Sequence, residues 1–177
     1  MLDTLFKMAF YTSHKSKCKY LRKHKAKIGN NVQMFIPVNN FGSEPWLVEI
    51  GNNVLISFGV YFVTHDGGMS VIRNLDSEKK RLDRLGKITV GNNVFIGCNS
   101  TIMLNAVIPD NVIIGAGSVV TSKEMQPNSV YAGVPAKRIC SIDEYYEKHI
   151  GEYTETKGMT SEQKRVFYEN SKKQTEK

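Results

Sequence analysis

A residue pattern with a period of six is the feature that most restricts how this chain folds. The string Ile-Gly-Asn-Asn-Val occupies residues 28–32 and again 50–54, and a copy that begins with valine occupies 90–94. A helix repeats every 3.6 residues and would leave this register within two repeats. An aliphatic or other large apolar side chain stands at the repeat position in Ile28, Met34, Ile50, Ile56, Phe62, Val90, Ile96, Ile102, Ile108, Ile114 and Val120.

A period of six fits a solenoid whose short strands turn a corner every six residues and stack on the coil below. Glycine often follows the repeat position, and asparagine or glycine comes next, where the backbone must turn tightly. A second inward position carries only small or medium side chains: Val32, Val54, Val60, Val94, Ser100, Ala106, Val112 and Ser118. The pattern predicts an all-β solenoid with a narrow core into which Ile102 and Ile108 point.

Four segments carry a family resemblance: IGNNVLI (50–56), VGNNVFIGCNS (90–100), VIPDNVIIGAGSVVTSK (107–123) and YAGVPAKRI (131–139). They resemble the hexapeptide-repeat acyltransferases, which fold as a left-handed parallel β-helix. The nearest group is the galactoside, maltose and capsule or lipopolysaccharide sugar O-acetyltransferases. The resemblance covers about residues 20–145. It implies the left hand of the coil and direct, acetyl-CoA-dependent acetylation of a sugar hydroxyl.

The repeat divides the chain into three predicted parts. Residues 1–27 form a basic helix or arm, 28–139 form the left-handed β-helix acetyltransferase domain, and 140–177 form a helical extension. Residues 40–49 and 67–87 interrupt the repeat as insertions. In the extension we expect a helix at 142–149 and a second helix that opens with a capping box at 160–163.

Histidine is the natural base for an alcohol, because its pKa lies near neutrality. Of His14, His24, His65 and His149, only His65 lies where a coil meets the long insertion, and the catalytic histidine of the family stands at that kind of place. We therefore expect His65 to be the general base. Asp66 is a candidate for acceptor binding. Adjacent side chains on an extended chain point to opposite sides, so a side-chain pair between Asp66 and His65 is disfavoured.

The remaining candidate site residues are implied by the resemblance. The oxyanion would be met by backbone N–H groups around Gly97 and Cys98, where galactoside-type relatives carry a serine in place of Cys98. Coenzyme A would contact Ala116 and the segment from Thr121 to Lys123, with Lys137 and Arg138 as phosphate partners. Acceptor candidates in the shorter insertion are Asn39, Asn40 and Trp46. Acetyl-CoA is the expected cosubstrate, and no metal is expected.

The charge is concentrated at the N-terminus. The whole chain has a formal net charge of +7, and residues 1–27 hold eight Lys or Arg against Asp3, so the remaining residues balance. This segment could meet an anionic membrane, while no basic-aromatic motif points to nucleic acid. There is no run of 18 apolar residues and no signal-peptide pattern, which favours the cytoplasm. The three cysteines lack metal-like spacing and are expected to be free thiols.

Several alternatives stay open. A catalytically silent solenoid scaffold would need no histidine at the coil, and a γ-type carbonic anhydrase would need three zinc-binding histidines on the solenoid, where only His65 stands. The resemblance also implies a homotrimer whose active sites lie between subunits, with the 67–87 insertion reaching a neighbour. The identity of the acceptor, an amine acceptor and a longer acyl donor are not decided by the sequence.

Overall fold

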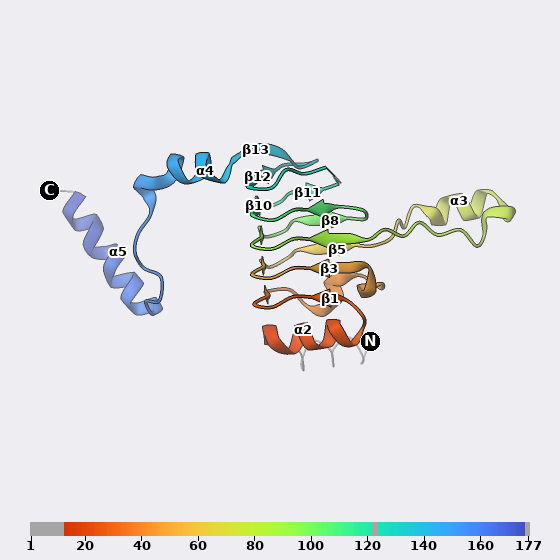
Figure 1. Ribbon diagram of the computed structural model, residues 1–177, viewed down its shortest axis with the longest axis horizontal. Helices are drawn as coiled ribbons and strands as arrows, with labels where there is room; N and C mark the ends of the chain where they lie inside the picture. The colour runs from red at the N-terminus through yellow and green to blue at the C-terminus, as the bar shows by residue number, and fades with distance from the viewer. Residues whose placement is uncertain (1–12, 122–123, 176–177) are drawn as a thin grey trace. The chain divides into compact units, whose positions relative to one another are not determined.

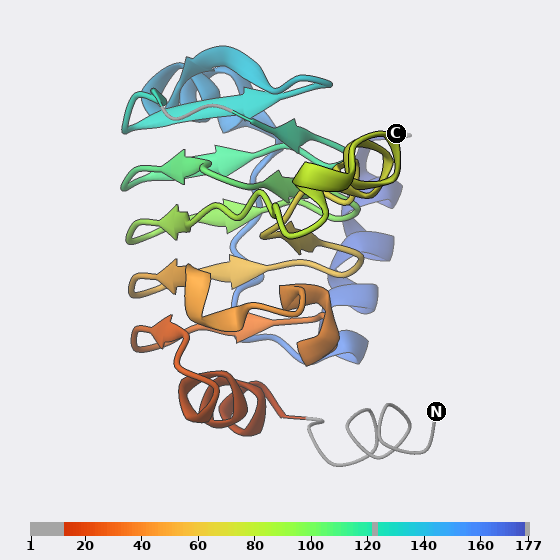
Figure 2. The ribbon, with the colours of Figure 1, turned by 90° about the vertical axis from the view of Figure 1, so that its right-hand side faces the viewer.

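The computed structural model describes residues 13–121 and 124–175, and their strands stack into three sheets that wrap around one core (Figures 1 and 2). The first sheet contains β1 (Lys27–Ile28), β3 (Val48–Ile50), β6 (Ile88–Val90) and β9 (Val107–Ile108). The second contains β2 (Gln33–Met34), β4 (Leu55–Ile56), β7 (Phe95–Ile96), β10 (Val112–Ile114), β12 (Ser129–Ala132) and β13 (Lys137–Ser141). The third contains β5 (Tyr61–Val63), β8 (Thr101–Met103) and β11 (Val119–Val120). All neighbouring strands pair in parallel except β12 and β13.

The register confirms the repeat. Each apolar anchor pairs with the anchor of the next coil, as in Phe62 with Ile102 and Ile102 with Val120. Ile102 is 0% exposed and Ile108 is 1% exposed, as predicted. Every second inward position is buried as well, including the hydroxyls of Ser100 and Ser118. The insertions therefore loop out of the solenoid without shifting the core.

Asparagines hold one corner of the solenoid. Asn31, Asn53, Asn93, Asn111 and Asn128 all have φ between 52° and 58°, the left-handed conformation that asparagine tolerates better than most residues. Side-chain amides bridge successive coils, with Asn93 donating to Asn111 and Asn111 donating to Asn128 at 2.8 Å. The ladder explains why the repeat keeps asparagine at this position.

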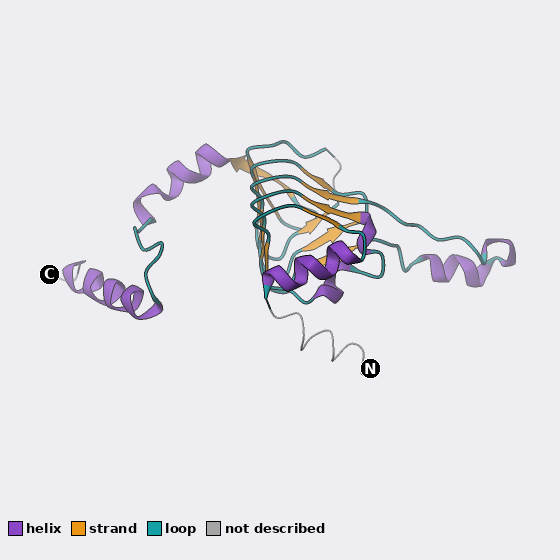
Figure 3. Cartoon of the chain, turned by 60° about the horizontal axis from the view of Figure 1, so that its bottom comes forward, coloured by secondary structure: helices purple, strands orange, loops and turns teal. Residues whose placement is uncertain are grey.

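Helix α2 (His14–Lys23) covers the N-terminal end of the solenoid (Figure 3). It begins at Ser13, whose side chain accepts from the Ser16 N–H, and it buries Cys18 and Leu21 against the first coil. The shorter insertion contains the 3₁₀ helices η1 (Val38–Phe41) and η2 (Pro45–Leu47). The longer insertion contains α3 (Met69–Leu75) and η3 (Ser77–Lys79), and it projects away from the coils (Figure 1).

The C-terminal extension is helical: α4 (Ile142–His149), η4 (Ile150–Glu152) and α5 (Ser161–Thr175). Ser141 and Glu144 form a capping box at the start of α4, and Thr160 and Gln163 form the predicted one at α5. The chain divides into two compact units, one up to Tyr145 and one from Tyr146 onward. Residues 1–12 of the basic segment lie outside the described residues. Within the described part of the chain, no helix is long and apolar enough to cross a bilayer.

Candidate active site

The structure joins His65 to a carboxylate that the repeat pattern did not single out. His65 lies just beyond β5, and its Nδ1 is 2.9 Å from Oε2 of Glu44 in the shorter insertion. An ionised carboxylate only accepts hydrogen bonds, so Nδ1 donates and carries the proton. The neutral ring then presents an unprotonated Nε2, the form that a general base requires. The side chain of His65 is 46% exposed, whereas that of Glu44 is 16% exposed.

Close packing of the shorter insertion on the coil places Glu44 beside His65. The rings of Phe41 and Phe62 are buried and stack with centroids 4.6 Å apart, which fixes η1 on β5. Gly42 then turns the chain with φ of 70°, and an added Cβ would stand 2.7 Å from Oγ1 of Thr64. That Thr64 hydroxyl donates to the same Glu44 oxygen at 2.7 Å. A glycine is therefore needed here for the Glu44 segment to pass close to the coil.

The carboxylate of Glu44 is held in its charged form. Burial by itself raises its pKa, but hydrogen bonds from Thr64 and His65, joined by the charge of His65 when its ring is protonated, outweigh burial and lower the pKa below its ordinary value. Glu44 therefore stays ionised near neutral pH and continues to hold the Nδ1 proton of His65.

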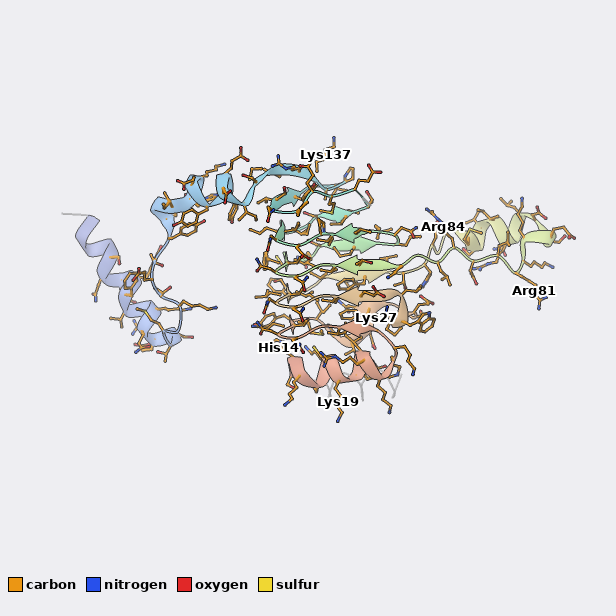
Figure 4. All side chains as sticks on the ribbon, in the orientation of Figure 1. His14, Lys19, Lys27, Arg81, Arg84 and Lys137 are labelled. Atoms are coloured by element: carbon orange, nitrogen blue, oxygen red, sulfur yellow. The ribbon has the colours of Figure 1, made fainter. Side chains whose placement is uncertain are left out.

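The backbone at His65 forms the stem of the longer insertion. His65 and Leu85 form an antiparallel bridge, and the Gly86 N–H donates to the Thr64 carbonyl at 2.9 Å. Among the described residues, no hydrogen bond joins Asp66 to the histidine ring. Its carboxylate accepts from Arg84 at 2.9 Å and from the Gly68 N–H at 2.9 Å. These bonds, the one from Arg84 first, lower the pKa of Asp66. Figure 4 shows Arg84 near the point where the insertion leaves the solenoid.

The other acceptor candidates lie in the shorter insertion, and the structure gives them different surroundings. Asn40 is half-buried and its Nδ2 donates to the Val60 carbonyl at 2.9 Å, which makes it a support for the coil. Its Oδ1 and the second Nδ2 hydrogen are left for the predicted acceptor role. Trp46 is 54% exposed and lines a cavity against α2, together with Asn39.

The predicted oxyanion residues lie at another corner of the solenoid. The Gly97 N–H donates to the Ile114 carbonyl at 2.8 Å, so that donor is used by the coil and is not available to an oxyanion. This corrects one half of the predicted pair. Among the described residues, no hydrogen bond engages the Cys98 N–H. The next coil stacks closely on this corner: Gly117 N–H donates to the Cys98 carbonyl at 2.8 Å, next to Ala116.

This corner and His65 lie at opposite ends of the parallel strands of the third sheet. Cys98 precedes β8, whereas His65 follows β5, and the two strands pair in register with Tyr61 opposite Thr101 and Val63 opposite Met103. A base and an oxyanion donor must both lie within hydrogen-bond reach of one reacting group. One subunit does not bring these groups together.

The phosphate candidates lie at the C-terminal end of the solenoid. Lys137 and Arg138 belong to β13 and are exposed, and Figure 4 shows Lys137 at this end. The Arg138 Nε donates to Oγ of Ser129 at 3.1 Å, which fixes part of the side chain. Thr121 is exposed just after β11, and Lys123 lies outside the described residues. Within the described ranges, no group of three or more His, Cys, Asp or Glu side chains is placed to hold a metal ion.

Comparisons with known proteins agree with this architecture. The family model "Bacterial transferase hexapeptide (six repeats)" matches residues 87–122. Protein CapG of Staphylococcus aureus is 41% identical over 155 residues, which cover 87% of this chain and 88% of that protein. The putative acetyltransferase SH0499 of Staphylococcus haemolyticus (strain JCSC1435) is 37% identical over 117 residues, which cover 56% of this chain and 59% of that protein. A galactoside acetyltransferase solved in complex with coenzyme A is 26% identical, with a TM-score of 0.51 and 82% of each chain covered.

The repeat, the three sheets of stacked parallel strands (β13 excepted) and these relatives assign the chain to the hexapeptide-repeat family of bacterial transferases, with the left-handed parallel β-helix fold. Within that family it is an acetyltransferase.

Proposed function

We propose that this protein is an acetyl-CoA-dependent O-acetyltransferase that acts on a sugar hydroxyl, with His65 as general base. The observation that carries the proposal is the hydrogen bond from His65 Nδ1 to the ionised Glu44, because it leaves Nε2 free to accept a proton. The relatives add support for acetyl transfer, for coenzyme A and for a saccharide acceptor. The galactoside acetyltransferase is named for a sugar acceptor and was solved with coenzyme A.

The proposed reaction is a direct transfer. Nε2 of His65 takes the proton of the acceptor hydroxyl as its oxygen attacks the thioester carbonyl of acetyl-CoA. The Cys98 N–H of a neighbouring copy of the chain donates to the oxygen of the tetrahedral intermediate. The C–S bond then breaks, the thiolate of coenzyme A leaves, and His65 returns the proton to that sulfur. Glu44 stabilises the imidazolium between these steps, because the ion pair forms when Nε2 is protonated.

The rest of the coenzyme would follow the coils. Pantetheine would pass the Cys98 and Ala116 corner, where backbone groups of successive coils are close together. Thr121 and Lys123 would flank it, and Lys137 and Arg138 would bind phosphate by charge-assisted hydrogen bonds. Asp66, already paired with Arg84, would bind acceptor hydroxyls with its remaining acceptor capacity.

The reaction is tested by thiol release from acetyl-CoA in the presence of monosaccharides, disaccharides, nucleotide sugars and amino sugars. A reaction without any acceptor measures hydrolysis. We expect at least one saccharide to raise thiol release well above hydrolysis and to gain an ester-linked acetyl group by mass spectrometry. Acetylation only at an amine, or no stimulation by any saccharide, would overturn the assignment of the acceptor.

We also propose that the active form is a homotrimer with each site shared by two subunits. The separation of His65 from the Cys98 corner within one subunit supports a shared site. A second support is the projecting insertion, which exposes apolar side chains that a neighbour could cover: Val71, Ile72, Leu75, Leu82 and Leu85 are between 41% and 82% exposed.

A mixing experiment tests the shared site. Subunits with His65→Ala and subunits with Ala116→Trp should each be inactive, the second because a bulky side chain blocks the coenzyme path. After subunit exchange, mixed trimers should regain part of the activity, since some interfaces combine an intact histidine with an intact path. Exchange proven by mass spectrometry without recovered activity would rule out shared sites, and a monomer at assay concentration would rule out the trimer.

The basic N-terminal segment is proposed to touch an anionic membrane. In its described part, Lys15, Lys19 and Lys23 are exposed at intervals of four on α2, and Lys19 points away from the solenoid (Figure 4). Cosedimentation with vesicles that contain phosphatidylglycerol should exceed that with neutral vesicles and should fall with salt. Equal sedimentation with both vesicle types would contradict the proposal.

A further inference from the structure

A cavity of about 450 Å³ lies between α2 and the shorter insertion, outside the reacting centre. Its lining includes Tyr20, His24 and Lys25 from the end of α2 and Asn39, Ser43 and Trp46 from the insertion. The volume lies in the range of small-molecule sites, which start at roughly 300 Å³. Helix α2 and the insertion lie side by side at the N-terminal end of the solenoid (Figures 1 and 2).

Two of the three aromatic side chains that line this cavity, Tyr20 and His24, are held by contacts within the protein. The rings of Tyr20 and His24 stack with centroids 4.0 Å apart and an interplanar angle of 29°. The Nδ1 of His24 bonds to the Tyr20 carbonyl at 2.9 Å, which holds the imidazole in place. Trp46 remains 54% exposed, so its face is open to a ligand. Rigid aromatic faces beside the Asn39 amide and the Ser43 hydroxyl suit a sugar ring, which has both C–H faces and hydroxyl edges.

The charge of the cavity selects among sugars. No Asp or Glu is among its described lining residues, whereas His24 and Lys25 both line it. Residues 13–27 contain no acidic side chain at all. Charge-assisted hydrogen bonds from a cation to a carboxylate are stronger than neutral ones. The lining therefore favours a saccharide that carries a carboxylate over a neutral one.

The cavity shares a chain segment with the catalytic pair. Ser43 and Pro45 line the cavity, and Glu44 between them points its carboxylate to Thr64 and His65. A ligand in the cavity therefore lies against the segment that orients the base. We propose that this cavity is a subsite for an acidic saccharide unit, of the uronic acid type, within or beside the acceptor. Its role in acceptor binding depends on the proposed sugar acetylation, but its ligand class can be measured alone.

The only tryptophan of the chain is Trp46, so its fluorescence reports this cavity directly. The full chain is titrated with trigalacturonic acid and with maltotriose, a neutral trisaccharide, at low ionic strength. We expect a saturable change in emission with trigalacturonic acid, at least about tenfold tighter than with maltotriose and weakened by salt. No saturable change, or equal affinity for both trisaccharides, would overturn the proposal.

Two charge-removing variants test whether the cavity lining itself binds the acidic saccharide. Lys25 has φ of 69°, so Lys25→Asn removes the charge with a residue that tolerates this conformation. It should weaken trigalacturonic acid binding about tenfold, the size expected for one charge-assisted contact. Lys23→Asn, a matched charge removal outside the lining, should leave binding unchanged. Equal losses in both variants would indicate general electrostatics and would contradict a built site.

His65→Ala distinguishes this inference from the proposed reaction. Trigalacturonic acid binding should survive in His65→Ala, because the cavity does not use that side chain. If the wild-type protein binds trigalacturonic acid but acetylates no saccharide, the proposed reaction fails and the subsite stands. If it acetylates saccharides but Trp46 emission does not respond, the subsite fails and the reaction stands.

Discussion

The two halves of the solenoid share the same kind of apolar core but differ in the insertions that interrupt their coils. From β6 to β11 the coils follow one another without an insertion, and this half carries the Cys98 and Ala116 corner. From β1 to β5 the repeat is interrupted after β2 and then again after β5, and these interruptions carry Glu44 and the stem at His65. The regular half offers a repeated backbone surface, and the interrupted half supplies titratable side chains. The repeat therefore forms the scaffold, and the interruptions supply the residues proposed for acid–base chemistry.

The largest expected effect tests whether the chemistry resides in the interrupted half. His65→Ala should lower kcat by about 10²–10⁴-fold through loss of general-base catalysis. His149→Ala, in the C-terminal unit, is the control and should leave kcat unchanged. Steady-state thiol release measures both, and circular dichroism checks the fold. If His65→Ala kept a third of the wild-type activity, the base would have to be sought elsewhere.

Core substitutions in the regular half should lower the stability of the fold. Ile102→Ala should lower the free energy of unfolding by about 2–5 kcal/mol, because it leaves a cavity in a fully buried layer. Ile139→Ala removes the same atoms at a position that is 62% exposed, and it should change stability by less than about 0.5 kcal/mol. Denaturant unfolding compares the two. Equal losses would mean that the layers of the regular half do not carry the stability of the solenoid.

Glu44→Gln sharpens the comparison within the interrupted half. The amide keeps the size of the side chain but cannot stabilise the imidazolium, so we expect kcat to fall about 10–10²-fold with a smaller change in KM. Asp66→Asn, which removes a carboxylate that is hydrogen-bonded to Arg84 and not to the histidine, should affect kcat less and should weaken acceptor binding instead. The reverse order of the two effects on kcat would assign the positioning role to Asp66.

The stability of Glu44→Gln relative to wild type should also depend on pH in a definite direction. The folded-state pKa of Glu44 is lowered, so its stabilising contribution is present above the unfolded pKa, about 4.3, and is lost as pH falls through the folded value. Below about pH 4 the difference in unfolding free energy between wild type and Glu44→Gln should therefore shrink as pH falls. A difference that stayed unchanged down to about pH 2 would contradict a stabilising role of the ionised Glu44.

The smallest expected effect concerns phosphate recognition at the end of the solenoid. Lys137→Met combined with Arg138→Gln should raise the KM for acetyl-CoA about tenfold and leave that for acetyl-pantetheine nearly unchanged, because the shorter donor has no nucleotide phosphates. Lys157→Met combined with Lys164→Gln is the control for net charge. Equal increases for the two donors would remove Lys137 and Arg138 from the phosphate site.

Much of this protein is determined by the sequence alone. The period of six places every anchor from Ile28 to Val120 in the core, because the same inward-facing position recurs in each stacked strand. The corner positions can also be predicted from their asparagines, since few residues tolerate the left-handed backbone there. His65 stands out because a coil ends beside it. The helix Ile142–His149 and the capping box at Thr160 follow from local signals that need no tertiary contact.

The tertiary structure alone decided what surrounds these residues. Glu44 lies 21 residues from His65 in an irregular segment, and it reaches the ring only because Gly42 and the Phe41–Phe62 stack fold that segment onto the coil. Periodicity describes the coils but carries no information on how an insertion folds back. The hydrogen bond from the Gly97 N–H to the Ile114 carbonyl is likewise a contact between coils that the sequence does not reveal. The cavity at Trp46 exists because α2 packs beside the insertion, and the packing of a helix on an irregular segment leaves no repeat in the sequence.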